Sequence, residues 1–330
     1  MDRQVLNRLL TEQHGLISRR QVVELGGDDE LLDRMLRRRE LRRVRRGVFV
    51  NHTGELSWDQ RAWSVLLNYW PAALADESAI QAEGLRLGSR APIGWESDRG
   101  GADGPLQVAV DAGRRVKQVA GVRLHRVRGL EGLLHPARKP PRMRLEHAVV
   151  RVASKATSDS RAVAVLADAC QSRRTTAVRL RSALDDHPNL PRRSEIRMVL
   201  EDVASGTHSL LEHRYVTRVE RPHGLPESTR QGRVEVEGRS TYRDAEYRHQ
   251  RMVVELDGRL GHEDALDYWA DLDRDIDSAV DGDLTIRLEW RHTDEPCRTA
   301  ESVGRLLKAR GWMGTVRPCG PGCTAVDRPA

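Results

Sequence analysis

The chain has 330 residues, a formal charge of +6, four cysteines and 38% hydrophobic residues. This length suffices for two or three domains, and no apolar run approaches the roughly 20 residues that a membrane span needs. Four cysteines are too few for a disulfide scaffold and the N-terminus lacks the layout of a signal peptide. The sequence therefore predicts a cytoplasmic protein without a membrane partner.

Charge is unevenly distributed along the chain. Between Arg34 and Arg46 eight arginines stand against one acid, whereas Met252 to Trp290 holds twelve acids against three arginines. Arginine binds phosphate through a rigid fork of donors, and carboxylates are ligands for hard divalent cations. The distribution is typical of a polyanion-binding protein with a metal-dependent site, although an ordinary protein with one acidic helix would show it too.

The first 50 residues predict three short helices followed by a hairpin. Apolar residues at helical spacing predict a helix over residues 2–13, and Ser18 is a suitable N-cap for a second helix. Acids followed by arginines predict a third helix over residues 28–39, and the alternation of apolar and basic residues over 41–50 predicts a β-hairpin. This order indicates a winged helix-turn-helix that reads the major groove with its third helix and contacts phosphates with its hairpin. The predicted DNA-binding residues are Arg34, Arg37, Arg38, Arg42, Arg43, Arg45 and Arg46.

The stretch from Gly15 to Val50 resembles the N-terminal domain of AbiEi-type antitoxins and related regulators in its helix order, leucine positions and basic wing. The resemblance implies a DNA-binding module and a toxin as a partner protein. It extends to about residue 150, through strands predicted over 106–110 and 122–127. A winged helix used for protein contacts would have the same pattern.

The remainder of the first half is mostly helical. Residues 55–90 carry tryptophans in an apolar stripe at helical spacing, which predicts core packing rather than a base-stacking platform. Residues 144–203 also predict helices, interrupted near Pro188. We therefore expect an α+β multidomain protein with a DNA-binding domain at 1–52, a middle α/β and helical region at 53–190, and a third domain at 191–330.

Two neighbouring strands of the third domain are expected to bring carboxylates together. The run from Met252 to Leu256 is apolar and rich in β-branched residues, which predicts a buried strand. Glu255 and Asp257 lie two residues apart, so their side chains leave the same face, and a hairpin with the strand over 242–247 would bring Asp244 near them. Such a group of carboxylates favours Mg²⁺. A solvated acidic strand end is the alternative interpretation.

The predicted element order of the third domain is α-β-β-β-α-β, the core order of the PD-(D/E)XK, or restriction-endonuclease-like, fold. The domain resembles the family related to very-short-patch-repair (Vsr) endonucleases. The matching residues are Ser209 to Glu212, Asp244, Glu255 to Gly258, His262, Asp271 to Asp275 and Leu284 to Leu288.

The resemblance implies a role for each candidate catalytic residue. Asp244 would be the central metal ligand, Glu255 would complete the Mg²⁺ site, and Glu212 would orient the site or hold a water. His262 would transfer a proton near neutral pH. The sequence departs from the family pattern at Asp257, which stands where a lysine is expected, and no proline precedes Asp244.

These features predict a DNA-binding protein with a Vsr-like nuclease domain that hydrolyses phosphodiesters with Mg²⁺ in repair or defence. A non-catalytic regulator, or a type IV antitoxin with a degenerate nuclease domain, stays open as the alternative. An RNA substrate is open as well.

Three cysteines lie near the C-terminus. Cys297, Cys319 and Cys323, together with His292, would suit a tetrahedral zinc site. The spacing between Cys319 and Cys323 is weak evidence for a metal, and a pair of reduced thiols on a loop is preferred over zinc at this point.

Overall fold

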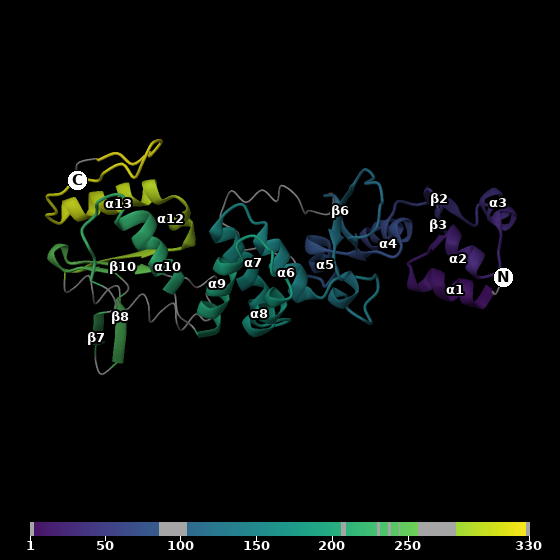
Figure 1. Cartoon of the computed structure of the whole chain (residues 1–330), viewed down its shortest axis with the longest axis horizontal. Coiled ribbons are helices and arrows are strands. Elements are labelled where there is room, and N and C mark those ends of the chain that lie inside the picture. The colour runs from purple at the N-terminus through teal and green to yellow at the C-terminus, as the bar shows by residue number, and fades with distance from the viewer. Residues whose placement is uncertain are drawn as a thin grey trace. The chain divides into compact units, whose positions relative to one another are not determined.

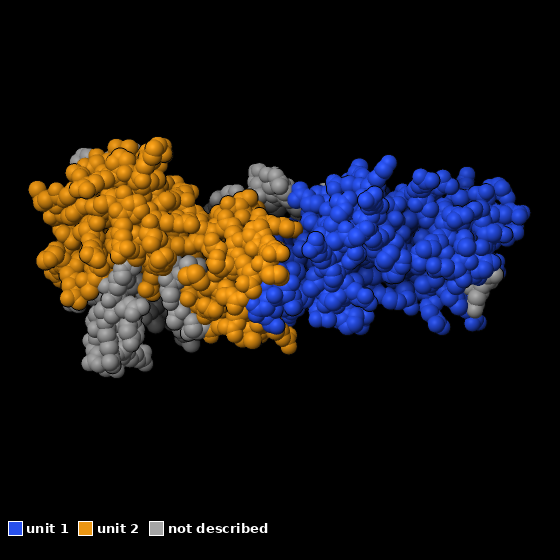
Figure 2. Space-filling view, in the orientation of Figure 1, with its two compact units in different colours: residues 1–152, 172–175, 182–187 blue, residues 153–171, 176–181, 188–330 orange. Residues whose placement is uncertain are grey.

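In the computed structural model the described residues are 3–85, 104–205, 209–229, 232–236, 239–243, 245–256 and 282–327. Asp244, Asp257 and His262 lie outside them, as do the residues Asp271 to Asp275 that contribute to the resemblance to Vsr-like endonucleases. The chain divides into unit 1, residues 1–152 with 172–175 and 182–187, and unit 2, residues 153–171 with 176–181 and 188–330 (Figure 2). Both units combine helices with small sheets, which confirms a mixed helix and strand class.

None of the helices in the described ranges has the combination of length and apolar character that crossing a bilayer requires.

The N-terminal part of unit 1 has the predicted helices and hairpin (Figure 1). Ser18 forms a capping box with Gln21 at the start of α2, and the Asp28 carboxylate accepts the Leu31 N–H at the start of α3. The predictions of three helices, of Ser18 as a cap and of a hairpin are confirmed. The elements are α1 (Arg3–Glu12), β1 (Leu16–Ser18), α2 (Arg19–Glu24), α3 (Asp29–Arg37), β2 (Arg42–Arg45) and β3 (Val48–Val50).

The three strands form a sheet in the order β1-β3-β2, and both of its faces are covered. Ile17 and Phe49 lie opposite each other and pack on one face with apolar side chains of α1, α2 and α3. Leu16 and its neighbours Val48 and Val50 pack on the other face against helix α4 (Trp58–Tyr69). The alternation of side chains along a strand explains this division. Helix α4 therefore contributes to the core of the N-terminal module, although it lies beyond the end of the first domain predicted at residue 52.

The rest of unit 1 is a second small sheet with helices. Strands β5 and β6, both predicted, are parallel, and β4 pairs antiparallel with β5. Asp76 at the start of α5 is fully buried; it accepts a hydrogen bond from Arg151 Nε of α6 at 2.6 Å and lies 3.3 Å from His125 Nε2. These contacts join α5, β6 and α6. The elements are β4 (Ala73–Leu74), α5 (Asp76–Ala82), β5 (Leu106–Asp111), β6 (Val122–Val127), the 3-10 helix η1 (Leu130–Leu133) and α6 (Leu145–Ser154).

Two histidines of unit 1 pack edge to face. His147 on α6 and His187, just after α8 (Ala177–Asp185), have ring centroids 5.3 Å apart. Within the described residues, Nδ1 of His147 and Nε2 of His187 have no hydrogen-bond partner. Burial, followed by repulsion from His147, lowers the pKa of His187 to about 4, and burial lowers the pKa of His147 as well. Folding therefore favours the neutral form of both rings.

This pair predicts a pH-dependent stability. The unfolded chain protonates His187 below the normal histidine pKa near 6.5, whereas the folded chain protonates it only near pH 4, so stability falls as pH falls through this window. His187 alone is expected to lower the free energy of unfolding by about 2 kcal/mol between pH 7 and pH 5. Urea unfolding at both pH values measures the loss, which should be smaller by that amount in His187→Gln. Equal losses in the two proteins would contradict the prediction.

Unit 2 contains the predicted strands of the C-terminal domain. Residues 209–214 form an α-helix, which continues as a π-helix over residues 215–220. The elements are α7 (Asp159–Gln171), α9 (Arg193–Ser205), α10 (Ser209–Arg214), the π-helix η2 (Tyr215–Glu220), β7 (Gly232–Val236), β8 (Arg239–Arg243), β9 (Ala245–Tyr247), the 3-10 turn η3 (Arg248–Gln250), β10 (Met252–Leu256), β11 (Leu284–Leu288), α12 (Trp290–Asp294) and α13 (Pro296–Ala309).

The sheet that carries the predicted acids has the order β11-β10-β9, with β10 antiparallel to β9 and parallel to β11. One face of the sheet is apolar, and η2 lies against it. At this contact the buried Tyr247 hydroxyl of β9 donates to Glu220 at 3.0 Å and lies 2.8 Å from the Tyr215 hydroxyl. The register places Glu255 beside Arg287 and Glu246 opposite Val253 on the other face. The sheet thus has one apolar face and one face with charged residues.

Candidate functional site

The seven predicted DNA-binding arginines lie on α3, at its C-cap Arg38 and on the β2–β3 hairpin of one packed module. Five of them are exposed: Arg34, Arg37, Arg38, Arg43 and Arg46. Glu40, the one acid among them, lies 3.9 Å from Arg38 with both side chains about half exposed or more. Most of this positive charge is therefore open to solvent and to a polyanion.

The other two arginines support the module itself. Arg42 is half-buried and donates to the carbonyl oxygens of His52 and Gly54, at 3.3 and 2.9 Å. Arg45 donates to the Ser64 hydroxyl of α4 at 3.1 Å, and burial lowers its pKa. Because these guanidinium groups are engaged inside the protein, they position the hairpin against its surroundings. The sequence pattern did not distinguish them from the exposed arginines.

Of the predicted catalytic residues, Glu255 and Glu212 fall within the described chain. Glu255 lies on β10, and its carboxylate accepts a hydrogen bond from Arg287 Nε of β11 at 3.0 Å, with each side chain about a third exposed. Glu212 is half-buried on α10. The last described pair of β9 and β10 is Ala245 opposite Val254, one residue short of Asp244 and of Glu255. The pattern of the sequence did not single out Arg287.

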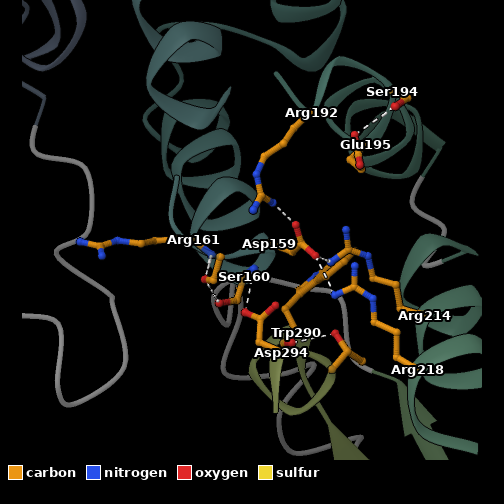
Figure 3. Close-up of polar contacts among 12 residues, drawn as sticks. Asp159, Ser160, Arg161, Arg192, Ser194, Glu195, Arg214, Arg218, Trp290 and Asp294 are labelled. Atoms are coloured by element: carbon orange, nitrogen blue, oxygen red, sulfur yellow. Dashed lines mark hydrogen bonds and ion pairs between the residues drawn. The ribbon is translucent and has the colours of Figure 1, made fainter. Parts of the chain in front are cut away.

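A buried ionic cluster joins four segments of unit 2. Figure 3 shows the guanidinium groups of Arg192, Arg214 and Arg218 directed at the Asp159 carboxylate at the start of α7. Asp159 is 8% exposed and Arg214 is 5% exposed. Burial is the largest influence on the pKa of Asp159 and raises it, but the three arginines together bring it below its usual value. The cluster therefore contains an ionised carboxylate whose charge the arginines more than balance.

The contacts of α12 extend this cluster. The Ser160 N–H of α7 donates to the Asp294 carboxylate at 3.1 Å, and the Arg214 guanidinium lies 5.5 Å from the ring centre of Trp290 (Figure 3). The α7 helix, which precedes the domain boundary predicted at 190, is thereby joined to the C-terminal helices. We interpret the cluster as structural because each charged group in it is engaged with a protein partner.

A third site consists of His223, Cys297, Cys319 and Cys323, whose four ligand atoms all lie within 4.8 Å of one another. His223 follows η2, Cys297 lies in the first turn of α13, and the other two cysteines lie in the C-terminal segment. The structure thus brings His223, rather than His292, to the cysteines. His292 accepts the Glu289 N–H at 2.8 Å and caps α12.

The thiols of this cluster affect one another. Backbone N–H groups of Cys319 and Ala325 lower the pKa of the Cys323 thiol to about 6, and the hydrogen bond with Cys323 raises the pKa of Cys319 to about 11. The surroundings therefore favour the thiolate form at Cys323 and the protonated form at Cys319.

No model of a known protein family matches the chain, and a search of curated proteins found no match either. The resemblances to AbiEi-type antitoxins and to Vsr-like endonucleases therefore stay predictions.

Proposed function

We propose that the chain is a DNA-binding protein whose N-terminal module acts as a winged helix-turn-helix. The observation that carries this proposal is the set of exposed arginines on α3 and on the β2–β3 hairpin, within a module whose elements follow the order helix, strand, helix, helix and hairpin. In such a module the third helix contacts base edges and the hairpin contacts phosphates. The resemblance to AbiEi-type antitoxins supports the same role.

Paired substitutions of exposed arginines test this proposal. Arg43→Ala with Arg46→Ala on the hairpin is expected to weaken binding to every duplex by about tenfold or more and to reduce the salt dependence by about one counterion per arginine. Arg34→Ala with Arg37→Ala on α3 is expected to reduce the preference for a selected DNA sequence as well. Fluorescence anisotropy at several salt concentrations measures both effects.

The matched control is Arg128→Ala, which removes an exposed arginine outside the module. Its affinity should equal that of the native chain. If both paired variants bound DNA as tightly as this control, the module would serve protein contacts instead.

The C-terminal domain supports a second proposal, Mg²⁺-dependent phosphodiester hydrolysis on a PD-(D/E)XK-like sheet. The specific observation is that Glu255 sits on the charged face of the β11-β10-β9 sheet, beside Arg287. The resemblance to Vsr-like endonucleases assigns Asp244, which lies outside the described residues, to the same metal ion as Glu255. The two carboxylates would hold the ion, which would polarise a phosphoryl oxygen and activate water.

The residues of this chain would supply the remaining roles. Glu212 would hold a water, and His262 would transfer a proton. Arg287 places a cation beside Glu255 in a site where Asp257 replaces the expected lysine. The alternative is a regulator or antitoxin, with a toxin partner, whose nuclease-like domain has lost activity. Cleavage of DNA and RNA in the presence of Mg²⁺ distinguishes the two.

A further inference from the structure

We infer that His223, Cys297, Cys319 and Cys323 bind a zinc ion that fastens the C-terminal segment to unit 2. Three sulfur atoms and one imidazole nitrogen converge from three separate parts of the chain, residue 223, residue 297 and the 319–323 loop. Three cysteines and one histidine are a common ligand set of structural zinc sites. This site is independent of the proposed DNA-binding and nuclease residues.

The spacing of the ligand atoms fits tetrahedral coordination. Zinc bond lengths of about 2.3 Å to sulfur and about 2.0 Å to nitrogen place two sulfurs about 3.8 Å apart and sulfur and nitrogen about 3.5 Å apart. Cys297 Sγ lies 3.7 Å from Cys319 Sγ and 3.5 Å from Cys323 Sγ, and Cys323 Sγ lies 3.7 Å from His223 Nε2. Each of these three distances is within a few tenths of an ångström of the tetrahedral value, and the other ligand pairs lie within 4.8 Å.

His223 is oriented as a metal ligand. Its side chain is fully buried, and Nδ1 lies 2.9 Å from the Val219 carbonyl oxygen, which can only accept. Nδ1 therefore carries the proton and Nε2 directs its lone pair toward the cysteines. A histidine that binds zinc typically donates its other N–H to a carbonyl or carboxylate in this way.

The loop between Cys319 and Cys323 is folded to bring the two sulfurs together. Cys323 N–H donates to the Gly320 carbonyl at 3.1 Å, and Gly322 has a φ of +84°, a left-handed conformation that glycine adopts without strain. The sequence of the loop, Cys-Gly-Pro-Gly-Cys, favours such a tight turn. Binding would replace the thiol protons by the ion.

A metal would explain how the C-terminal segment is held. Residues 311–327 contain no helix or strand, yet Val316 is buried against Gly304 of α13, where an added Cβ would lie only 2.3 Å from the Val316 side chain. The Arg317 N–H donates to the His223 carbonyl at 2.8 Å, and Asp327 accepts from Lys308 at 2.6 Å. An irregular terminal segment normally needs such an attachment to stay in place. Zinc would link it both to α13 and to the end of η2.

Metal analysis of the purified chain tests the inference. We expect about one zinc ion per chain after dialysis, and we expect a cobalt-loaded sample to show the visible absorption of a tetrahedral thiolate site. Cys297→Ser, Cys323→Ser and His223→Gln should each lower the bound zinc at least about tenfold. Cys170→Ser and His292→Gln are matched controls outside the cluster and should keep it.

Chelation provides a second measurement that does not depend on the folding of variants. Removing zinc from the native chain is expected to lower the midpoint of thermal unfolding and to make residues 311–327 more accessible to protease, and adding zinc back should reverse both changes. The inference would be overturned by a native chain that holds no zinc and gives no cobalt spectrum. A disulfide among Cys297, Cys319 and Cys323 in freshly purified protein would overturn it too.

Discussion

Glu255→Gln is expected to reduce Mg²⁺-dependent DNA cleavage by about 100-fold or more while leaving DNA affinity unchanged. The substitution keeps the shape of the side chain but removes the charge that would bind the ion. Glu255 accepts from Arg287 at 3.0 Å, so the neutral amide also loses an ion pair on the sheet surface. The arginines proposed to contact DNA are in unit 1, whereas Glu255 is in unit 2, so we expect binding and cleavage to be separable.

Conversion of supercoiled plasmid to nicked and linear forms, in Mg²⁺ or Mn²⁺, measures the effect. Asp244→Ala should abolish cleavage in the same assay, because it removes the other proposed ligand. Glu227→Gln, an exposed acid outside the sheet, is the matched control and should cut at the native rate. A native chain that cuts neither DNA nor RNA would favour the regulator, and a fully active Glu255→Gln would exclude this residue as a ligand.

Asp159→Asn is expected to lower the free energy of unfolding by about 3–5 kcal/mol, the usual cost of removing one partner from a buried ionic cluster. The variant leaves Arg214, 5% exposed, without the anion that it faces together with Arg192 and Arg218. It also weakens the attachment of α7 to the C-terminal helices. Urea unfolding at pH 7 measures the loss.

A surface ion pair provides the control for this substitution. Glu295 lies 3.4 Å from Arg298, with side chains 65% and 82% exposed, and Glu295→Gln should cost less than about 1 kcal/mol. The effect of Asp159 also has its own pH signature. Because its folded-state pKa is lowered, its stabilisation is present above about pH 4 and is lost only as pH falls further. An Asp159→Asn chain as stable as the Glu295→Gln chain would show that the cluster contributes little.

Elements with a strong local pattern were predicted well. The capping residues Ser18 and Asp28 start their helices where the sequence indicates, and the alternation over 41–50 yields the hairpin. The apolar run from Met252 to Leu256 forms the predicted buried strand. In each case the information lies within a few neighbouring residues, so the chain needs no distant partner to specify the element.

Elements that depend on distant partners were missed. Strand β1 has only three residues and exists because it pairs with β3, about 30 residues away. The π-helix η2 interrupts a regular helical pattern, where Tyr215 and Glu220 reach Tyr247 of β9. The spacing of residues along the sequence predicts neither the β1–β3 pairing nor the π-helix.

For the candidate sites too, some features could be predicted from the sequence and others were decided only by the tertiary structure. Residue types and their order were enough to indicate a basic N-terminal module, an acidic strand and a group of C-terminal cysteines, because charge and polarity are properties of the side chains themselves. Packing decided the rest: Arg42 and Arg45 support the hairpin, Arg287 pairs with Glu255, and His223 stands with the cysteines in place of His292. These relations depend on which distant segments meet, and only the burial of a shared core brings such segments together.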